Sequence, residues 1–299
     1  MAAPERILKT EHAEIWIGDC LDPEVVAGVL AGRAANAVIV DAPYSERTHR
    51  GHDDGVATTE RVTDWARRKA ARGEGSVQVS QKSREAIRVG AHRRELGYVA
   101  WSVDEVARFV DLWVEPCNGW AFSLTDHVLA RVWEEELERL ERYVFSPLAC
   151  VESGSRFRAS GDGPSQWSVW GIAARPRSRH FATWGALDGA YVVPPGYSQA
   201  RSGRRAAGVA GAKPLWLMSA IVRDYSRPDD IVVDPCAGGG TTIGAAVLLG
   251  RYGIGVERDR ATAELAAERV AATKPQLAMH AVVEAPLRVQ TGLAGLEEP

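Results

Sequence analysis

The 299-residue chain is poor in cysteine and has no long hydrophobic run. Its four cysteines lie far apart and form no Cys-x-x-Cys pair, which argues against a zinc site and against a disulfide framework. The seven histidines show no metal-like spacing. No stretch of about 18 apolar residues is present to span a membrane, and the first residues, MAAPERILKTEHAE, lack the apolar core of a signal peptide. We therefore expect a cytoplasmic protein with free thiols and no metal site.

An excess of charge of either sign is also absent, because 36 Lys and Arg nearly balance 39 Asp and Glu. The distribution is uneven, however. Residues 45–98 hold 12 basic and 8 acidic side chains, a net charge of +4, and residues 156–213 hold 9 basic and 2 acidic side chains, a net charge of +7. With a total of -3, the remainder carries -14. An acidic body with two basic segments favours a polyanionic partner, although charge alone supports two solvated loops equally well.

The chain does contain a series of apolar segments with strand or helix periodicity. Strands are expected within 13–22, 37–40, 119–124, 142–151, 166–175, 230–235 and 252–259. Helices are expected within 103–113, 128–140, 214–226, 240–250 and 261–272. Residues 45–98 and 176–212 lack sustained periodicity. The alternation of strand and helix in the last third predicts an α/β fold with a mostly parallel sheet.

One predicted strand ends in a distinctive set of side chains. The apolar run Val38-Ile39-Val40 stops at Asp41-Ala42-Pro43-Tyr44, which sets a carboxylate, a rigid proline and an aromatic ring at one strand end. An aspartate after a strand is common in turns. Taken alone, the motif therefore fits either a structural turn or a functional site.

A second strand end is rich in glycine. In IVVDPCAGGGTTIGAAV (231–247), Gly238, Gly239 and Gly240 join a strand to a helix. Glycine lets the backbone approach a ligand, and the first turn of a helix offers free N–H groups. The next strand ends at Glu257, whose carboxylate can accept both hydroxyls of a ribose, so the pair fits an adenosine-containing cofactor. The dinucleotide fingerprint Gly-x-Gly-x-x-Gly and a Walker lysine are both missing, and a purely structural turn is the alternative for the glycines alone.

Four motifs, in order, resemble those of S-adenosylmethionine-dependent DNA amino-methyltransferases. DPCAGGGTT (234–242) is similar to their Asp-Pro-Phe-x-Gly-x-Gly-Thr-Thr cofactor motif, and DAPY (41–44) to their catalytic (Asp/Asn/Ser)-Pro-Pro-(Tyr/Phe/Trp) motif. KPLWLMSAIV (213–222) resembles the Lys-Pro segment before the cofactor strand, and GDCLD (18–22) the Gly-Asp turn before the catalytic motif. The catalytic motif comes first, as in the circularly permuted β group, and the inserted 45–98 is most similar to phage or prophage enzymes.

The resemblance covers about residues 13–272. It implies a Rossmann-like, doubly wound α/β fold with a mostly parallel sheet and permuted motif order. It also implies a single methyltransferase domain over 1–299, with DNA-facing insertions at about 45–98 and 176–212.

The resemblance assigns catalysis to Asp41, Ala42, Pro43 and Tyr44. An exocyclic base amine is a poor nucleophile because its lone pair is conjugated into the ring. Asp41 and a main-chain carbonyl, at Ala42 or Pro43, would each accept a hydrogen bond from the amine and make its lone pair available. Tyr44 offers a face for the base, which must leave the duplex. Ala42 stands where the family has its first proline, so the carbonyl is kept and some rigidity is lost.

The implied cofactor is S-adenosyl-L-methionine, held by several segments. These are Asp19 and Cys20; Lys213 and Pro214; Asp234, Pro235, Cys236, Ala237, Gly238, Gly239, Gly240, Thr241 and Thr242; and Glu257 and Arg258. By resemblance, Glu257 takes the ribose hydroxyls and Asp19 with Cys20 the adenine edge. Thr241, Thr242 and Lys213 lie near the methionine carboxylate. Cys236 replaces a family phenylalanine and would cover the cofactor less.

Double-stranded DNA is the expected partner, with contacts expected from Arg47, His49, Arg50, Arg204 and Arg205. In the family, Asp at the first catalytic position goes mostly with adenine N6 and Ser mostly with cytosine N4, which favours adenine N6 here. A cytosine-N4 enzyme, an RNA or protein amino-methyltransferase and a non-catalytic DNA-binding relative stay open. Dimers are frequent in the β group, and the sequence identifies neither a recognition site nor a restriction partner.

Overall fold

One mixed sheet organises the part of the chain that the structure describes. The computed structural model describes residues 3–48, 99–156, 166–182, 184–193 and 212–276. Within these ranges ten strands pair in the order β1-β2-β10-β9-β3-β4-β7-β6-β8, and β5 pairs with β7. Their bounds are β1 Glu5–Lys9, β2 Ala13–Ile17, β3 Ala37–Asp41, β4 Trp120–Thr125, β5 Tyr143–Val144, β6 Leu148–Arg156, β7 Gln166–Arg175, β8 Ala190–Val193, β9 Ile231–Asp234 and β10 Tyr252–Glu257. The central strands β2, β10, β9, β3 and β4 are mutually parallel, and β7 runs antiparallel beside β4.

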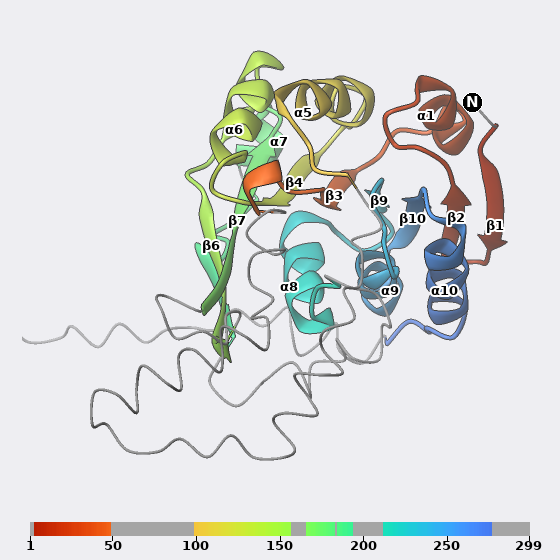
Figure 1. Cartoon of the computed structure of the whole chain (residues 1–299). Coiled ribbons are helices and arrows are strands. Elements are labelled where there is room, and N and C mark those ends of the chain that lie inside the picture. The colour runs from red at the N-terminus through yellow and green to blue at the C-terminus, as the bar shows by residue number, and fades with distance from the viewer. Residues whose placement is uncertain (1–2, 49–98, 157–165, 183, 194–211, 277–299) are drawn as a thin grey trace, which may run out of the picture.

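Helices cover both faces of this sheet (Figure 1). One face carries α1 (Pro23–Leu30), α5 (Val103–Phe109) with the π-helical turn Val110–Val114 that continues it, and α6 (Ala130–Arg139). The other face carries α8 (Leu215–Tyr225), α9 (Thr241–Leu248) and α10 (Arg260–Ala271), and α7 (Arg179–Ala182) is a single short turn.

Strand β3 is buried on both faces. Because successive side chains of a strand point to opposite sides, Val38 and Val40 pack in the cluster of α1, α5 and α6, whereas Ala37 and Ile39 pack in the cluster of α8 and α9. A strand covered on both faces has a continuous apolar sequence, as β3 has in Ala37–Val40.

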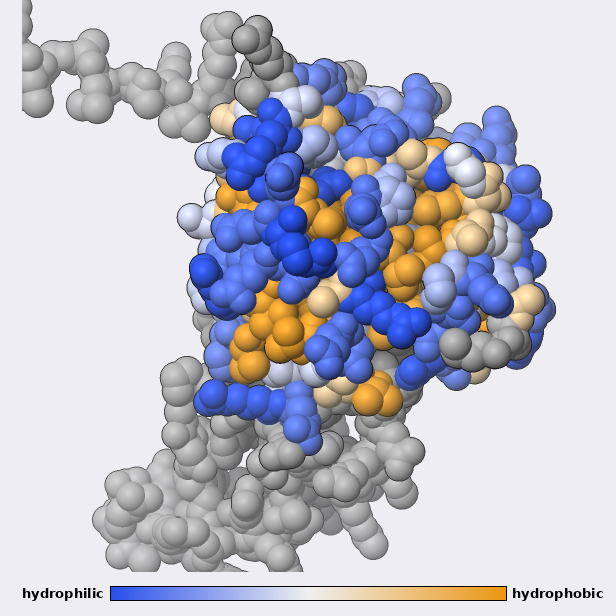
Figure 2. All heavy atoms as spheres, turned by 90° about the horizontal axis from the view of Figure 1, so that it is seen from above, coloured by the Kyte–Doolittle hydropathy of each residue, from blue (hydrophilic) through white to orange (hydrophobic). Residues whose placement is uncertain are grey.

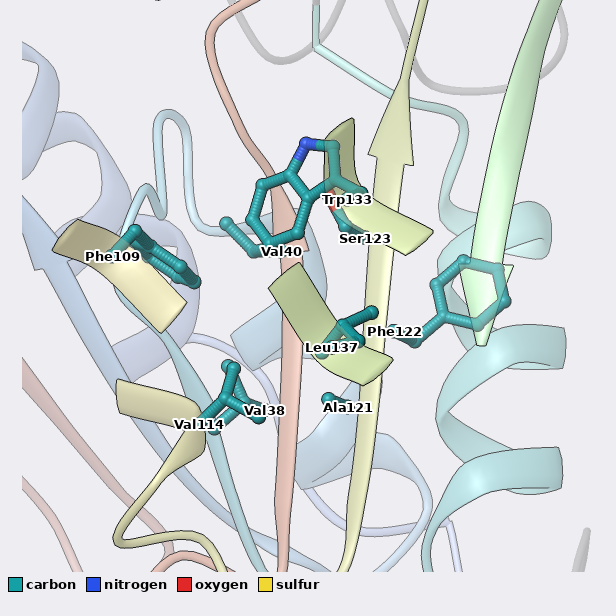
Figure 3. Close-up of a pocket in the computed structure, with 9 residues that line it drawn as sticks. All are labelled: Val38, Val40, Phe109, Val114, Ala121, Phe122, Ser123, Trp133 and Leu137. Carbon is teal, nitrogen blue, oxygen red and sulfur yellow. The ribbon is translucent and has the colours of Figure 1, made fainter. Parts of the chain in front are cut away.

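The core between β3, β4, α5 and α6 is closely packed. Figure 3 shows side chains around a cavity of about 10 Å³, roughly the space of one water molecule. Its lining is apolar except for one serine: Val38, Val40, Phe109, Val114, Ala121, Phe122, Ser123, Trp133 and Leu137. The cavity is therefore a packing void and not a ligand site.

The expected α/β class and the parallel centre of the sheet are confirmed. Three details differ from expectation. The strand expected at 142–151 is two strands, β5 and β6, because Pro147 lies between them and has no N–H for a ladder. The segment 176–212, expected to be irregular, contains α7 and β8 in its described part. Strand β1 and helix α1 have no counterpart among the expected elements.

The described surface offers no continuous apolar face. No helix in the described ranges is long and apolar enough to cross a bilayer. Figure 2 shows one side of the molecule, on which hydrophobic side chains lie in patches separated by hydrophilic ones. The exposed large hydrophobic residues come from several elements: Val99, Val103, Val128, Tyr143, Trp170, Val192 and Leu215. Scattered apolar side chains are normal on protein surfaces and mark no docking surface.

Gly119, which leads into β4, lies against the backbone of Asn36. A Cβ at position 119 would lie 1.8 Å from the Asn36 carbonyl oxygen, which cannot swing away as a side chain can. Asn36 is fixed in turn by Ile231, because the Asn36 N–H donates to the Ile231 carbonyl at 2.9 Å and the Asn36 side-chain oxygen accepts from the Ile231 N–H at 2.8 Å.

We expect Gly119→Ala to lower the free energy of unfolding by at least ~2 kcal/mol, because the clash must separate β3 from β4. Urea denaturation measures the change. Gly189→Ala is the matched control, since a Cβ there meets nothing within 4 Å. Equal stability of the two variants would contradict the close approach at Gly119.

Candidate active site

Three parallel strands end at one edge of the sheet. Strand β3 pairs with β9 through Ala37 with Val232 and Val38 with Val233, and β9 pairs in parallel with β10. Because parallel strands deliver their carboxyl ends to the same edge, the strand-terminal residues Asp41, Asp234 and Glu257 gather there. Two motifs that lie far apart in the sequence therefore share one place in the fold.

Asp41 is held on both of its carboxylate oxygens. The Tyr44 hydroxyl donates to Oδ1 at 3.0 Å, and the Lys213 ammonium pairs with Oδ2. The same ammonium lies over the Tyr44 ring, 5.1 Å from its centroid. The Lys213 side chain is 6% exposed and the Asp41 side chain 23%. Resemblance puts Lys213 near a methionine carboxylate, whereas the structure pairs it with Asp41.

Asp126, just after β4, anchors the chain that follows Tyr44. Its Oδ2 accepts from the Ser45 N–H at 2.9 Å and from the hydroxyls of Ser45 and Thr48, while Oδ1 accepts from the Leu129 N–H at 3.0 Å. Burial opposes ionisation of Asp126, but the hydrogen bonds from Ser45 and Thr48 outweigh it and lower the pKa of the carboxyl. Asp126 is not among the residues expected from the sequence; its only signal there is an aspartate two residues after the predicted strand 119–124.

The described ends of the long inserted segment meet beside this motif. The Trp101 N–H donates to the Tyr44 carbonyl at 3.0 Å, and Ser45 forms a parallel bridge with Trp101. Trp101 packs in turn on Phe109 and Trp133, with ring centroids 5.4 and 6.4 Å away. The chain therefore leaves the sheet after Tyr44 and returns to it at the same point.

The glycine turn after β9 borders open space. Gly238 and Gly240 have φ angles of 49° and 74°, in the left-handed region that favours glycine. A Cβ on Gly238 would meet nothing within 4 Å, whereas one on Gly240 would press on Ala266. The Gly238 N–H donates to Glu257 Oε2 at 3.0 Å, and the Asp259 N–H donates to Oε1 at 2.8 Å. The turn and the end of β10 thus form one unit, and the Gly238 Cα is not covered by other described side chains.

Two carboxylates at this edge, those of Asp234 and Glu257, are destabilised as anions. Burial raises the pKa of Asp234 to about 7. Hydrogen bonds from Thr242 and from the Cys236 N–H oppose the shift, while the charges of Asp41 and Glu257 add to it. Burial also raises the pKa of Glu257. A ligand that brings positive charge would relieve this repulsion.

The turn after β2 reaches the same place. The Gly18 N–H donates to the Glu257 carbonyl at 3.1 Å, and Asp19 Oδ1 accepts from the Leu21 N–H at 2.9 Å. Cys20 Sγ lies 3.6 Å from Cys236 Sγ, a contact between residues 216 positions apart. The hydrogen bond with Cys20, together with burial, raises the pKa of Cys236. The residues expected at the adenine edge therefore lie beside the glycine turn.

The remaining predicted residues divide into three groups. Pro235, Ala237, Gly239, Thr241 and Thr242 are buried in the turn and the start of α9, and Pro214 is the N-cap of α8. Ala42 is buried in the core, Pro43 is half-buried, and Arg47 and Arg258 are exposed. His49, Arg50, Arg204 and Arg205 lie outside the described residues. Within the described ranges, no three His, Cys, Asp or Glu side chains form a group that could hold a metal.

A family profile described as DNA methylase matches residues 77–268, more than half of the chain. Two curated relatives match over shorter segments. The type II methyltransferase M.HinfI of Haemophilus influenzae is 40% identical over 63 residues, 21% of this chain and 18% of the relative. The type II methyltransferase M2.MboI of Moraxella bovis is 42% identical over 65 residues, 22% of this chain and 24% of the relative. The matched segments thus span about a quarter or less of these relatives.

Two solved structures are similar over most of their length. The M1.HpyAVI–SAM complex has a TM-score of 0.52 and 17% identity, over 86% of this chain and 98% of that one. TTHA0409 from Thermus thermophilus has a TM-score of 0.50 and 17% identity, over 89% of this chain and 97% of that one. At this identity the likeness establishes the fold alone, and it confirms the expected Rossmann-like methyltransferase fold.

Proposed function

The chain belongs to the N6/N4 DNA methylase family, and on that basis we propose that it transfers a methyl group from S-adenosyl-L-methionine to an exocyclic amine of a base in double-stranded DNA. One observation carries the proposal. The parallel pairing of β3 with β9 puts the motif Asp41–Tyr44 and the glycine turn at the same edge of the sheet. A base held at one motif and a methyl donor held at the other would lie within transfer distance, and such alignment of two reactants supplies much of the rate.

The residues around the glycine turn fit this cofactor. No described atom lies within 4 Å of a Cβ placed on Gly238, so a ligand could approach the backbone there, and the Glu257 carboxylate suits the two ribose hydroxyls. Asp19 and Cys20 would border the adenine ring. When bound, S-adenosylmethionine supplies a methyl group already activated by its sulfonium. The buried carboxyl of Asp234 favours a ligand that carries such a positive charge.

The motif after β3 would prepare the acceptor. Asp41 accepts one hydrogen bond from the base amine, and the carbonyl of Ala42 or Pro43 accepts the second. Two acceptors placed in this way favour a pyramidal nitrogen whose lone pair faces the methyl group. The ring of Tyr44 supports the base after it has left the duplex.

We propose adenine N6 as the target, because the first residue of the motif is Asp41. Cytosine N4 is the alternative within the same chemistry. An RNA or protein substrate and a DNA-binding role without turnover are further alternatives. The net charges of +4 for 45–98 and +7 for 156–213 support nucleic acid as the partner. We also propose that the chain is a single domain, that it forms a homodimer and that it is cytoplasmic. The proposed DNA contacts come from Arg47, His49, Arg50, Arg204 and Arg205.

A methyl-transfer assay tests both the function and the role of Asp41. Labelled cofactor is offered with duplex DNA, RNA and protein, and the DNA is digested to nucleosides for mass spectrometry. We expect label in DNA as N6-methyladenine. We expect Asp41→Ala to bind the cofactor within a few-fold of wild type but to lose at least ~10²-fold in turnover, because the lost acceptor acts in the transition state.

Two further variants sharpen this assay. Asp41→Asn keeps a side-chain oxygen and should lose less than Asp41→Ala, and Asp111→Ala, an exposed aspartate that pairs with Arg139, should behave as wild type. Label only in RNA or protein would overturn the proposed substrate. N4-methylcytosine alone would change the base and leave the mechanism intact.

The pKa of Asp234 predicts how cofactor binding depends on pH. Its carboxyl has a raised pKa of about 7, so it is largely neutral at pH 5.5 and largely ionised at pH 7.5. Because the ionised form attracts the sulfonium, the affinity for S-adenosylmethionine should rise with pH, by roughly tenfold across this interval. Isothermal titration calorimetry measures it.

The control for this prediction is Asp230, which immediately precedes β9. Asp234→Asn should bind weakly and almost independently of pH. Asp230→Asn, which also replaces an aspartate whose pKa burial raises, should keep the wild-type dependence. A dependence that survives in Asp234→Asn would assign the titration to another group.

A further inference from the structure

Lys213 occupies two of the contacts that the proposed function gives to the base. Its ammonium pairs with Oδ2 of Asp41, the proposed acceptor for the base amine. The same ammonium lies 5.1 Å from the centre of the Tyr44 ring, on which the base would stack. The Lys213 side chain is almost fully buried, at 6% exposure, so this is an interior contact and not a loose surface pair.

The fold fixes the backbone of Lys213, whereas the side chain itself is long and has several rotatable bonds. Lys213 immediately precedes Pro214, the N-cap of α8, and α8 packs through Leu217, Met218 and Ile221 in the cluster that also buries β3 residue Ile39. The backbone at 213 is thereby placed beside the end of β3. The side chain is a flexible four-carbon stem with a point charge, which can move without disturbing the helix.

The charges at this edge make the Lys213 contact dependent on the cofactor. In the absence of a ligand, the ammonium neutralises Asp41 beside the buried carboxyl of Asp234 and that of Glu257. The methyl carbon on the sulfonium must lie about 3–3.5 Å from the base nitrogen, which brings a second positive charge close to Asp41. Two cations then compete for one carboxylate, and the amino-acid carboxylate of the cofactor offers the displaced ammonium a new partner.

We propose that Lys213 closes the base site until the cofactor binds, an inference that rests on the proposed function. In the cofactor-free protein its ammonium holds Asp41 and the Tyr44 ring. Binding of the positively charged cofactor releases the ammonium from Asp41, and the base can then reach its acceptor and its stacking face. Lys213 is in this sense a positioning residue, which acts on the base through Asp41.

A thermodynamic consequence follows for the order of binding. If the cofactor opens the base site, it must raise the affinity for the base, and the base must raise the affinity for the cofactor by the same factor. The positive charge of the cofactor causes this increase in affinity. A neutral analogue should therefore raise the affinity for the base less than a charged analogue does. Removal of the Lys213 charge should abolish the coupling.

The experiment uses the full-length protein and a duplex that accepts methyl groups in the transfer assay, with a fluorescent analogue at the target base. Fluorescence rises when the analogue leaves the stack. Sinefungin, an unreactive analogue with an amine in place of the sulfonium, and S-adenosylhomocysteine, which is neutral at sulfur, are the two probes. Each is titrated with wild type, Lys213→Gln, Lys213→Arg and the control Lys9→Gln, whose lysine lies on the outer strand β1.

For wild type, Lys9→Gln and Lys213→Arg, we expect weak capture of the base without cofactor. Sinefungin should raise the base affinity by roughly tenfold, and S-adenosylhomocysteine should raise it less. For Lys213→Gln, we expect capture of the base without any cofactor and a coupling factor near one. The proposal is wrong if wild type captures the base equally well without cofactor, or if Lys213→Gln keeps the wild-type coupling.

Two outcomes separate this proposal from the function on which it rests. If wild type transfers no methyl group to DNA, the proposed function fails before Lys213 is tested. If transfer occurs but the affinity of Lys213→Gln for both analogues falls equally and the coupling persists, Lys213 is a cofactor ligand, as the resemblance implies, and not a gate. Circular dichroism of each variant confirms that the fold is kept.

Discussion

The parallel pairing of β3 with β9 is the interaction on which the site depends. It joins Ala37 to Val232 and Val38 to Val233. Just before these pairs, the main chain and the side chain of Asn36 both form hydrogen bonds with Ile231. Because the two strands run in the same direction, their carboxyl ends emerge together. The order of the motifs along the chain has no influence on this result, which is why a permuted order can still build one site.

The convergence of these strand ends brings acidic side chains close together. Asp41, Asp234 and Glu257 come together at this edge, and burial, together with the charges of Asp41 and Glu257, raises the pKa of Asp234 to about 7. The ion pair of Asp41 with Lys213 neutralises one of the three charges. Such an arrangement is poor for stability and suited to a cationic ligand, because bound positive charge turns repulsion into attraction. The cofactor preference and the gate at Lys213 both derive from this one property.

The sequence predicts those parts of the fold that depend on local pattern. The apolar run Val38–Val40, the glycine turn and the helices after it have short-range signals, and the structure has the corresponding elements. The break at Pro147 also has a local cause that the apolar pattern of 142–151 hides. Strand β1 is largely exposed along its length, so its sequence gives no apolar alternation to detect.

In the candidate site, too, some residues have a local sequence signal and others do not. The residues of the two strand ends are predictable because motifs mark them. The pairing of Lys213 with Asp41, the contact of Cys20 with Cys236 and the anchoring of Ser45 by Asp126 are not, because each joins side chains between 81 and 216 positions apart. Such contacts depend on strand order, which no short motif encodes.

If one sheet edge holds both the methyl donor and the acceptor motif, a crystal structure of the protein with S-adenosylhomocysteine will show both there. We expect the ribose hydroxyls on Glu257 and the sulfur directed to Asp41, close enough that a methyl group on it would lie within about 3–3.5 Å of an amine bound to that carboxylate. A nucleoside bound away from the glycine turn, or a sulfur directed away from Asp41, would contradict it.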